Sequence, residues 1–292
     1  MKEGQSSRTA EYVALFRAIE STLPPERRLF EDPYAKRFLG PRLALVAKLC
    51  SLPGAPDIVS RFIDYRWAGT RSSAVARTRF IDDAIRTAVE RGIEQLVILG
   101  AGFDSRAYRI DALKNVTVFE VDHPSTFARK QGLLRRALPG LPSRVRFVAT
   151  DFQGADLGLA MNGAGCSKQV PTFILWEGVT PYLSEAAVDT TLRWCAAAAS
   201  ESELLFTYVD RAVIDDPSAF AGTRRLFATL KAAGEEWKFG IDPTQLADFL
   251  SDRGLRLERD IGSAEYRAKY LSQVARAMRG YEFYRIALAR VP

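Results

Sequence analysis

Apolar residues follow two different spacings along this chain, and the two alternate. Short apolar runs of four to eight residues are typical of buried strands, whereas apolar positions that recur every three or four residues are typical of amphipathic helices. Alternation of the two predicts β-α-β units and therefore a mostly parallel sheet. Seven segments are predicted as strands: residues 96–99, 116–121, 145–149, 172–176, 203–208, 255–260 and 281–288.

The last of these strands, residues 281–288, differs from the others in its pattern. Its apolar residues alternate with polar ones and do not form a continuous run. Alternation suits a strand that has only one covered face, so we expect this strand at an edge of the sheet.

Helical spacing dominates the chain before the first predicted strand. Asp32 followed by Pro33 is typical of an N-cap with proline at the first helical position, and it predicts a helix through Leu39. Gly69 divides a longer helical pattern into two pieces, and Gly92 supplies its C-cap. The predicted helices cover residues 9–20, 32–39, 57–91, 125–137, 184–199, 220–232 and 243–253.

The segment 211–240 interrupts the alternation of strands and helices. It is too long for a tight loop and contains one helical pattern of its own, which predicts a cap inserted over the sheet. We therefore expect a single domain with an N-terminal helical lid over 1–92, a core over 93–210, the cap insertion over 211–240, and the C-terminal part of the sheet over 241–292.

The first strand ends abruptly in Gly100-Ala101-Gly102. Glycine lets a ligand approach the backbone closely, although such a pair is as often an ordinary turn from strand to helix. A dinucleotide-binding fingerprint needs a third glycine at position 105, where this chain has Ser105. A pyrophosphate cradle is therefore disfavoured.

Three carboxylates follow the next three strands: Asp122, Asp151 and Glu177. A single carboxylate in such a place is more often an N-cap or a solvated loop residue. Because the carboxyl ends of parallel strands meet at one edge of the sheet, three in succession favour a binding site. Asp122 lies 22 positions beyond Gly100, the spacing at which a carboxylate can accept both hydroxyls of a ribose.

Other residues extend this candidate site. Asp151 and Phe152 offer an acceptor for an exocyclic amine beside an aromatic ring, as an adenine requires, although a helix cap and a core phenylalanine would look the same. Glu177 could hold an ammonium group, and Arg77 could form a bidentate pair with a carboxylate. These groups together fit a zwitterionic amino acid joined to adenosine.

Composition narrows the classes of function. Lys+Arg 41 against Asp+Glu 35 gives a net charge of +6, and the charges are interspersed, so a nucleic-acid face is not indicated. Three scattered cysteines and one histidine, His123, form neither a zinc site nor a disulfide framework. Without an apolar leader or a long apolar run, we expect a cytoplasmic protein with no membrane partner.

Five motifs, in this order and spacing, resemble the leucine carboxyl methyltransferase family. The nearer likeness is to its bacterial branch, which includes enzymes similar to the polyketide carboxyl methyltransferase of tetracenomycin biosynthesis. The likeness extends over nearly the whole chain, residues 237–250 included. The motifs are Arg77-Thr78-Arg79-Phe80-Ile81-Asp82-Asp83, Leu99-Gly100-Ala101-Gly102-Phe103-Asp104-Ser105-Arg106, Glu120-Val121-Asp122-His123-Pro124, Asp151-Phe152 and Trp176-Glu177-Gly178-Val179-Thr180-Pro181-Tyr182-Leu183.

The resemblance implies a class I methyltransferase, with a Rossmann-like sheet that binds S-adenosyl-L-methionine. It also implies a role for each residue of the site. These are Arg77 on the methionine carboxylate, Gly100 at the methionine backbone, Asp122 on the ribose, Asp151 and Phe152 at the adenine, and Glu177 near the ammonium group.

Two further residues are candidates on the acceptor side. His123 could act as a general base, but Asp122-His123-Pro124 is better interpreted as a turn between strand and helix. Tyr182 is the better candidate for contact with the acceptor, although a core or lid aromatic would look the same.

The function expected from the sequence is O-methylation of a small-molecule acceptor, most simply a carboxylate of a polyketide or another secondary metabolite. A carboxylate is already anionic, so no metal is required and positioning suffices. The alternatives are a phenol or hydroxyl methyltransferase, a nucleotide-dependent oxidoreductase, and a cofactor-binding module without turnover. Ser105 and the carboxylates at 151 and 177 argue against the oxidoreductase.

Overall fold

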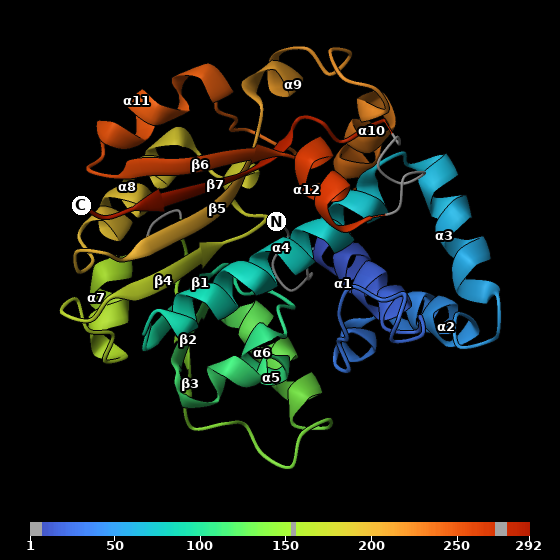
Figure 1. Ribbon diagram of the computed structural model, residues 1–292, viewed down its shortest axis with the longest axis horizontal. Coiled ribbons are helices and arrows are strands. Elements are labelled where there is room, and N and C mark those ends of the chain that lie inside the picture. Colours follow the sequence, from blue (N-terminus) through green and yellow to red (C-terminus); the bar gives the residue numbers. More distant parts are fainter. Residues whose placement is uncertain (1–7, 153–155, 272–278) are drawn as a thin grey trace.

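The computed structural model describes residues 8–152, 156–271 and 279–292, and its centre is one seven-stranded sheet (Figure 1). The strand order is β3-β2-β1-β4-β5-β7-β6, in which the first five strands are parallel and β7 is antiparallel to both neighbours. The predicted α/β class is therefore confirmed. The strands are β1 Gln95–Leu99, β2 Thr117–Asp122, β3 Val145–Ala149, β4 Thr172–Trp176, β5 Glu203–Val209, β6 Arg256–Gly262 and β7 Tyr284–Arg290.

The prediction that the last strand lies at an edge is wrong. β7 lies between β5 and β6, and the edge strand is β6. The polar residues of β7 misled the prediction because its arginines are paired with neighbouring carboxylates and do not require a solvent-exposed edge. Arg285 pairs with Asp260 on β6 at 2.6 Å, and Arg290 pairs with Glu201 at 2.9 Å.

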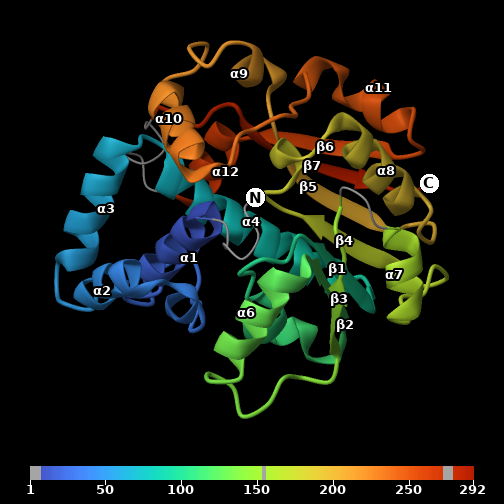
Figure 2. The ribbon, with the colours of Figure 1, turned by 180° about the vertical axis from the view of Figure 1, so that it is seen from behind.

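Helices cover both faces of the sheet. On one face α4 and α12 pack against side chains such as Leu96 and Phe173 (Figure 1). On the other face α7, α8 and α11 pack against residues such as Val97 and Trp176 (Figure 2). The helices with at least five residues are α1 Arg8–Glu20, α2 Pro41–Leu49, α3 Ala55–Arg66, α4 Thr70–Glu90, α6 Pro124–Leu134, α7 Leu157–Gly163, α8 Glu185–Ala196, α9 Arg211–Asp215, α10 Thr223–Ala233, α11 Leu246–Ser251 and α12 Ser263–Tyr270.

The division of the long N-terminal helical pattern at Gly69 is confirmed. Gly69 has φ +78°, and a Cβ atom there would lie 2.3 Å from the carbonyl oxygen of Gly280. The chain can pass at this distance only without a side chain. Gly69 therefore both separates α3 from α4 and sets how closely α4 approaches the segment before β7.

The helix predicted from Asp32 to Leu39 is only a short 3-10 helix, Ala35–Phe38, and α2 follows as a separate element. Asp32 does cap this turn, because its Oδ1 accepts hydrogen bonds from the backbone amides of Tyr34 and Ala35. Its other oxygen, Oδ2, forms an ion pair with Arg17 on α1, so Asp32 makes a tertiary contact as well as the cap. The sequence pattern therefore predicted the capping residue correctly but predicted too long a helix.

The segment 211–240 contains α9 and α10, which pack with Trp237 and Phe283 into a small apolar cluster of their own. The division of the chain into lid, core and cap at residues 92, 210 and 240 stays a prediction. Among the described residues, no helix is both long and apolar enough to cross a membrane.

A buried ion pair connects β2 to α6 beneath the turn that follows β1. The Lys130 ammonium lies 2.9 Å from Glu120 Oε2, and neither side chain is exposed to solvent. The same ammonium lies 3.4 Å from the Ala101 carbonyl oxygen, and the Tyr108 hydroxyl donates to Glu120 Oε2 at 3.2 Å. Burial raises the pKa of the Glu120 carboxyl, and the charge of Lys130 opposes that shift.

Replacement of Lys130 should reveal how much this pair contributes. Lys130→Met leaves the Glu120 carboxylate buried without its partner, a change that typically costs about 3–5 kcal/mol of unfolding free energy. Glu120 then binds a proton more tightly in the folded than in the unfolded state, so stability falls as the pH rises above the ordinary value of a glutamate. Chemical denaturation should therefore show a larger loss near pH 8 than near pH 5.

The control is the double variant Glu120→Gln/Lys130→Met, in which neither buried group carries a charge. We expect it to regain a substantial part of the lost stability and to lose the extra pH dependence. A single variant as stable as the native protein near pH 8 would show that the ion pair does not support the fold.

Candidate functional site

The turn after β1 approaches its neighbours too closely for any residue but glycine at position 100. Gly100 has φ +68°, and a Cβ atom there would lie 2.3 Å from Cγ2 of Val179. Two residues on, the backbone amide of Gly102 donates to Asp122 Oδ2 at 2.5 Å. The glycine turn is thus held between the ends of β2 and β4.

Asp122 ends β2 and stands directly against this turn. Its second oxygen accepts the backbone amide of His123 at 2.6 Å, so two amides orient the carboxylate. Burial raises the pKa of Asp122, and both amide hydrogen bonds oppose the shift. Each carboxylate oxygen can accept more than one hydrogen bond, so Asp122 keeps acceptor capacity for a ligand.

His123 is exposed and acts as the N-cap of α6. Its Nδ1 lies 2.8 Å from the Ser125 hydroxyl and accepts the Ser125 backbone amide at 3.3 Å. The interpretation of this residue as part of a turn between strand and helix agrees with the structure.

Asp151 and Phe152 directly follow β3. The Asp151 side chain is exposed, and Phe152 is half-buried against the apolar cluster that includes Val97 and Leu157. The next residues, 153–155, lie outside the described ranges. The structure therefore brings an exposed carboxylate and a half-buried ring to the same edge as Asp122.

Glu177, at the end of β4, binds two arginines. Its Oε1 accepts Arg77 Nε at 2.6 Å, and its Oε2 accepts Arg106 Nη1 at 2.8 Å. Burial would raise the pKa of this carboxyl, but the charges of Arg106 and Arg77 outweigh burial and hold the pKa below its usual value. The sequence predicted Arg77 and Glu177 as separate ligand groups, whereas the structure also pairs them with each other.

Arg77 lies on α4 and is almost completely buried, with 5% of its surface exposed. The centre of its guanidinium lies 4.7 Å from the ring centroid of Tyr284 on β7. A planar cation between an aromatic face and a carboxylate is restricted to one orientation, which favours recognition of another planar anion. α4 and β7 therefore position this group together.

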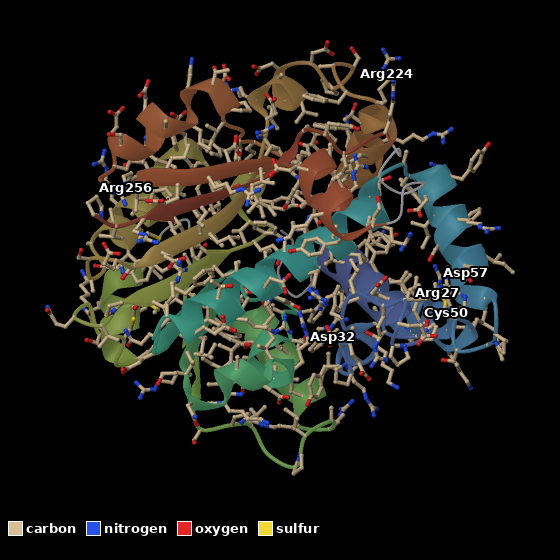
Figure 3. All side chains as sticks on the ribbon, in the orientation of Figure 1. Arg27, Asp32, Cys50, Asp57, Arg224 and Arg256 are labelled. Carbon is tan, nitrogen blue, oxygen red and sulfur yellow. The ribbon has the colours of Figure 1, made fainter. Side chains whose placement is uncertain are left out.

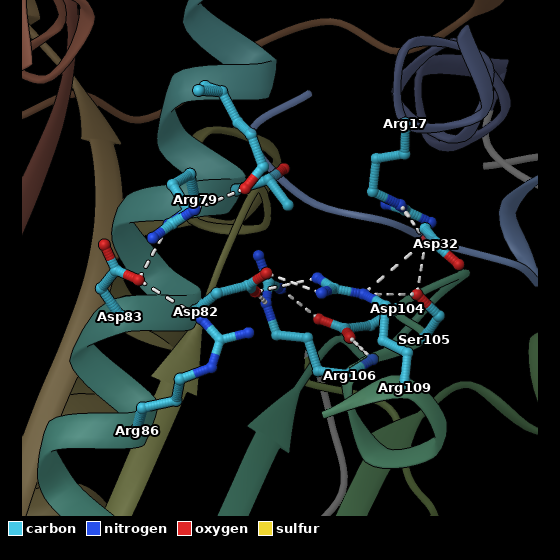
Figure 4. Close-up of polar contacts among 12 residues, drawn as sticks. Arg17, Asp32, Arg79, Asp82, Asp83, Arg86, Asp104, Ser105, Arg106 and Arg109 are labelled. Carbon is cyan, nitrogen blue, oxygen red and sulfur yellow. Dashed lines mark hydrogen bonds and ion pairs between the residues drawn. The ribbon is translucent and has the colours of Figure 1, made fainter. Parts of the chain in front are cut away.

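Arg77 and Glu177 are the end of a continuous buried network. From Glu177 it passes through Arg106 to Asp82 on α4, with distances of 2.8 Å in both steps. Asp82 also binds Arg109 at 2.6 Å, and Arg109 lies 3.9 Å from Asp32 (Figure 4). The network joins four carboxylates to four guanidinium groups: Asp32, Asp82, Asp104 and Glu177 to Arg17, Arg77, Arg106 and Arg109.

Ser105 fastens the N-terminal helices to this network. Its hydroxyl donates to Asp32 Oδ2 at 2.5 Å, and Arg17 donates to the Phe103 carbonyl at 2.6 Å. Ser105 stands where a dinucleotide-binding fold has its third glycine. Its hydroxyl therefore connects the turn after β1 to Asp32, in the segment that follows α1.

The middle of this network is not predicted from the sequence, although Asp82, Asp104 and Arg106 all stand in the five motifs of the family. One signal could have found Asp82. It lies on α4 beside Ile81 and Ile85, so a charge falls within the buried face of a helix. Charged residues on such a face are rarely buried without a partner, and the partner had to come from elsewhere in the chain.

Tyr182 lies where the start of α1 meets the segment that follows α10. It is half-buried and packs in the cluster that contains Trp237 and Tyr281. Burial raises its pKa to about 12. Glu235, in the same place, accepts the backbone amide of Arg8 at 2.6 Å, so the start of α1 is joined to the segment after α10 beside Tyr182.

Within residues 8–152, 156–271 and 279–292, no group of three or more histidine, cysteine, aspartate or glutamate side chains is arranged to hold a metal ion. The described residues of the site can bind a ligand through their charges and through oriented hydrogen bonds.

Comparison with known proteins places this geometry in a family. The profile of the leucine carboxyl methyltransferase family matches residues 10–196. A protein of Streptomyces coelicolor, provisionally named an S-adenosyl-L-methionine-dependent methyltransferase, is 36% identical over 71% of this chain and 70% of its own length. A protein of Frankia alni with the same provisional name is 34% identical over 77% of each chain.

A crystal structure supports the same fold over a longer stretch. A provisionally assigned methyltransferase of Thermobifida fusca superposes with a TM-score of 0.61 at 16% identity, and covers 99% of this chain and 96% of its own. The family profile ends at residue 196, so the family likeness expected over residues 237–250 stays a prediction. The resemblance inferred from the five motifs is confirmed, and the chain belongs to the leucine carboxyl methyltransferase family.

Proposed function

We propose that this S-adenosylmethionine-dependent methyltransferase transfers its methyl group to a carboxylate oxygen of a small organic acid, such as a polyketide or another secondary metabolite. The observation that carries the proposal is the charge-balanced network that ends at Arg77 and Glu177. It favours a zwitterionic ligand at one edge of the sheet, and the described site offers no obvious base for the acceptor.

The network fits the amino-acid end of S-adenosylmethionine. Arg77 can pair with the carboxylate of the methionine part, and Glu177 can accept from its ammonium group. Because the network already balances four cations with four anions, a zwitterion joins it without adding net charge to a buried place. An anionic dinucleotide would add uncompensated negative charge to this buried network.

The nucleoside end fits the groups along the neighbouring strands. Asp122, oriented by two amides, can accept the ribose hydroxyls, and Gly100 leaves the backbone bare where the methionine part would lie. Asp151 and Phe152 are assigned to the amine and the face of the adenine. When bound, S-adenosylmethionine supplies a methyl group on a sulfonium, which an acceptor oxygen attacks as the carbon–sulfur bond breaks.

The acceptor is assigned as a carboxylate because a phenol or alcohol must lose a proton before or during attack, and a carboxylic acid is already ionised near neutral pH. The histidine is a poor base here, since Nδ1 of His123 is engaged by Ser125. Tyr182, with a pKa of about 12, stays neutral. The residues near the acceptor therefore need only to orient it and to exclude water.

Asp122→Asn should weaken S-adenosylmethionine by about 10- to 100-fold, since hydrogen bonds to a charged acceptor contribute roughly 1.5–3 kcal/mol. Titration calorimetry measures the loss, and thermal unfolding checks that the variant still folds, because asparagine has one acceptor oxygen and can keep only one of the hydrogen bonds from the amides of Gly102 and His123. Asp156→Asn is the control, because Asp156 also accepts a backbone amide beside a helix start but lies on another loop. Native affinity in Asp122→Asn would remove this residue from the ribose site.

Arg77→Lys keeps the charge but removes the planar fork that a carboxylate prefers. We expect S-adenosylmethionine to bind at least about tenfold more weakly, and adenosine, which lacks the carboxylate, to bind almost unchanged. Arg79→Lys is the matched control, because Arg79 lies on the same helix and also bonds a carboxylate through Nε. Equal losses for both ligands would contradict a role in binding the methionine carboxylate.

The product identifies the acceptor group. Candidate acids and phenols are incubated with enzyme and S-adenosylmethionine, and methylated products are found by mass spectrometry. We expect a methyl ester, which mild alkali hydrolyses to methanol and the parent acid. A product that withstands alkali would be an ether, and it would contradict the carboxylate proposal.

His123→Ala tests the same assignment independently. If the acceptor is a carboxylate, turnover at saturating S-adenosylmethionine should fall by less than about tenfold, because no base is lost. A loss of about 10³ or more would instead identify His123 as the base for a hydroxyl acceptor.

A further inference from the structure

A groove of about 430 Å³ lies between the end of α3 and the start of α10. The ribbons show these two helices side by side at one end of the molecule, away from β1 to β3 (Figures 1 and 2). Residues 65–68 form one wall of the groove, and residues between 218 and 225 form the other. The lid and the cap thus build the groove together.

Three arginines line this groove: Arg66, Arg224 and Arg225. None of them forms an ion pair with a carboxylate in the part of the chain that the structure describes, whereas most arginines of the core do. Arg224 lies in the first turn of α10, at the periphery of the molecule (Figure 3). The three side chains are exposed, so a ligand can reach them.

The carboxylates nearest in sequence to these arginines have other partners. Asp64 binds Arg71 at 2.7 Å, and Asp215 binds Arg211 at 3.1 Å. Asp216 accepts the backbone amide of Ser218 at 2.8 Å, and its pKa is lowered chiefly by the hydrogen bonds from Ser218 and less by the charge of Arg224. The positive charge of the groove is therefore compensated only partly by its neighbours, which favours an anionic ligand.

Aromatic side chains line the same groove: Tyr65, Trp67 and Phe220. The guanidinium of Arg66 lies over the Trp67 ring at 4.8 Å from its centroid. Tyr65 is 86% exposed, an unusual state for a large aromatic residue at the rim of a cavity. Arginines beside rings provide one surface for a planar apolar body and another for an acidic substituent.

The inner wall of the groove leads to Arg77. A small cavity of about 10 Å³ shares Trp67, Ala68 and Gly222 with the groove and is bordered on its inner side by Tyr281 and Phe283. The Tyr281 ring lies 5.5 Å from that of Tyr284, which carries the guanidinium of Arg77 on its face. A chain of aromatic side chains therefore connects the groove to the edge where the methionine part is proposed to bind.

We propose that this groove binds a planar, anionic part of the methyl acceptor, distal to the carboxylate that is methylated. The assignment of the ligand as the acceptor rests on the proposed function, but the binding of a planar anion does not. The acceptor class is then an aromatic acid that carries a second negative group. Arg66, Arg224 and Arg225 bind this second group, and Trp67 and Phe220 contact the rings.

The probe for this groove is 8-anilinonaphthalene-1-sulfonate, whose fluorescence reports binding of an aromatic anion. N-phenyl-1-naphthylamine has the same rings without the sulfonate and serves as the neutral probe. In Arg224→Glu/Arg225→Glu the dissociation constant of the anion should rise at least about tenfold, and that of the neutral probe less than about twofold. Both probes should bind more weakly to Trp67→Ala.

The matched control is Arg135→Glu/Arg136→Glu, an exposed adjacent pair beyond α6 that changes the net charge equally. It should bind both probes like the native protein. Anion binding that is unchanged in the groove variant, or reduced as much in the control, would overturn the groove as the site. Circular dichroism and thermal unfolding of each variant show that the fold is intact.

Turnover measurements distinguish a failure of the groove proposal from a failure of the proposed carboxylate methylation. With a doubly acidic acceptor from the product survey, Arg224→Glu/Arg225→Glu should raise KM and leave kcat and S-adenosylmethionine affinity nearly unchanged. An unchanged KM together with the lost dye binding would contradict the groove as part of the acceptor site. If no acid is methylated by the native enzyme while the dye result holds, the carboxylate assignment fails and the groove remains an anion site.

Discussion

The buried network of four arginines and four carboxylates is the constraint on which the arrangement of the site depends. Ionised side chains are stable away from water only when each has partners of opposite charge in good geometry. Asp82 meets this condition through Arg106 and Arg109, and Glu177 through Arg77 and Arg106. Because the partners come from α1, the segment that follows it, α4, the turn after β1 and the end of β4, none of these elements can shift without exposing a buried charge.

This network and the Lys130–Glu120 pair hold the glycine turn from two sides. Lys130 reaches the carbonyl of Ala101 from α6, and Asp104 and Arg106 lie within the network that reaches α4. A turn fixed in this way presents its backbone to a ligand in a single conformation, so little ordering is needed on binding. The edge proposed to bind the cofactor is therefore held in place by buried ion pairs on two sides.

The part proposed to bind the acceptor is built differently. In the proposal its walls come from the helices before α4 and from the segment 211–240, which meet each other through contacts such as Arg8 with Glu235. The groove with Arg66, Arg224 and Arg225 belongs to this part, and Tyr281 and Tyr284 connect it with Arg77. A family can keep one cofactor site on the sheet and vary its acceptors through such peripheral segments.

The sequence alone determined the α/β class, the seven strands, the division of the long helical pattern at Gly69 and the family, because apolar spacing, glycine positions and short motifs are local properties of the chain. It also placed Asp122, Asp151 and Glu177 at one edge, since parallel strands end together. Only the tertiary structure decided that Arg77 and Glu177 bind each other, that Asp32 connects the lid to Ser105, and that the last strand lies inside the sheet. These facts depend on which distant charges meet, as Arg285 meets Asp260, and no local pattern contains that information.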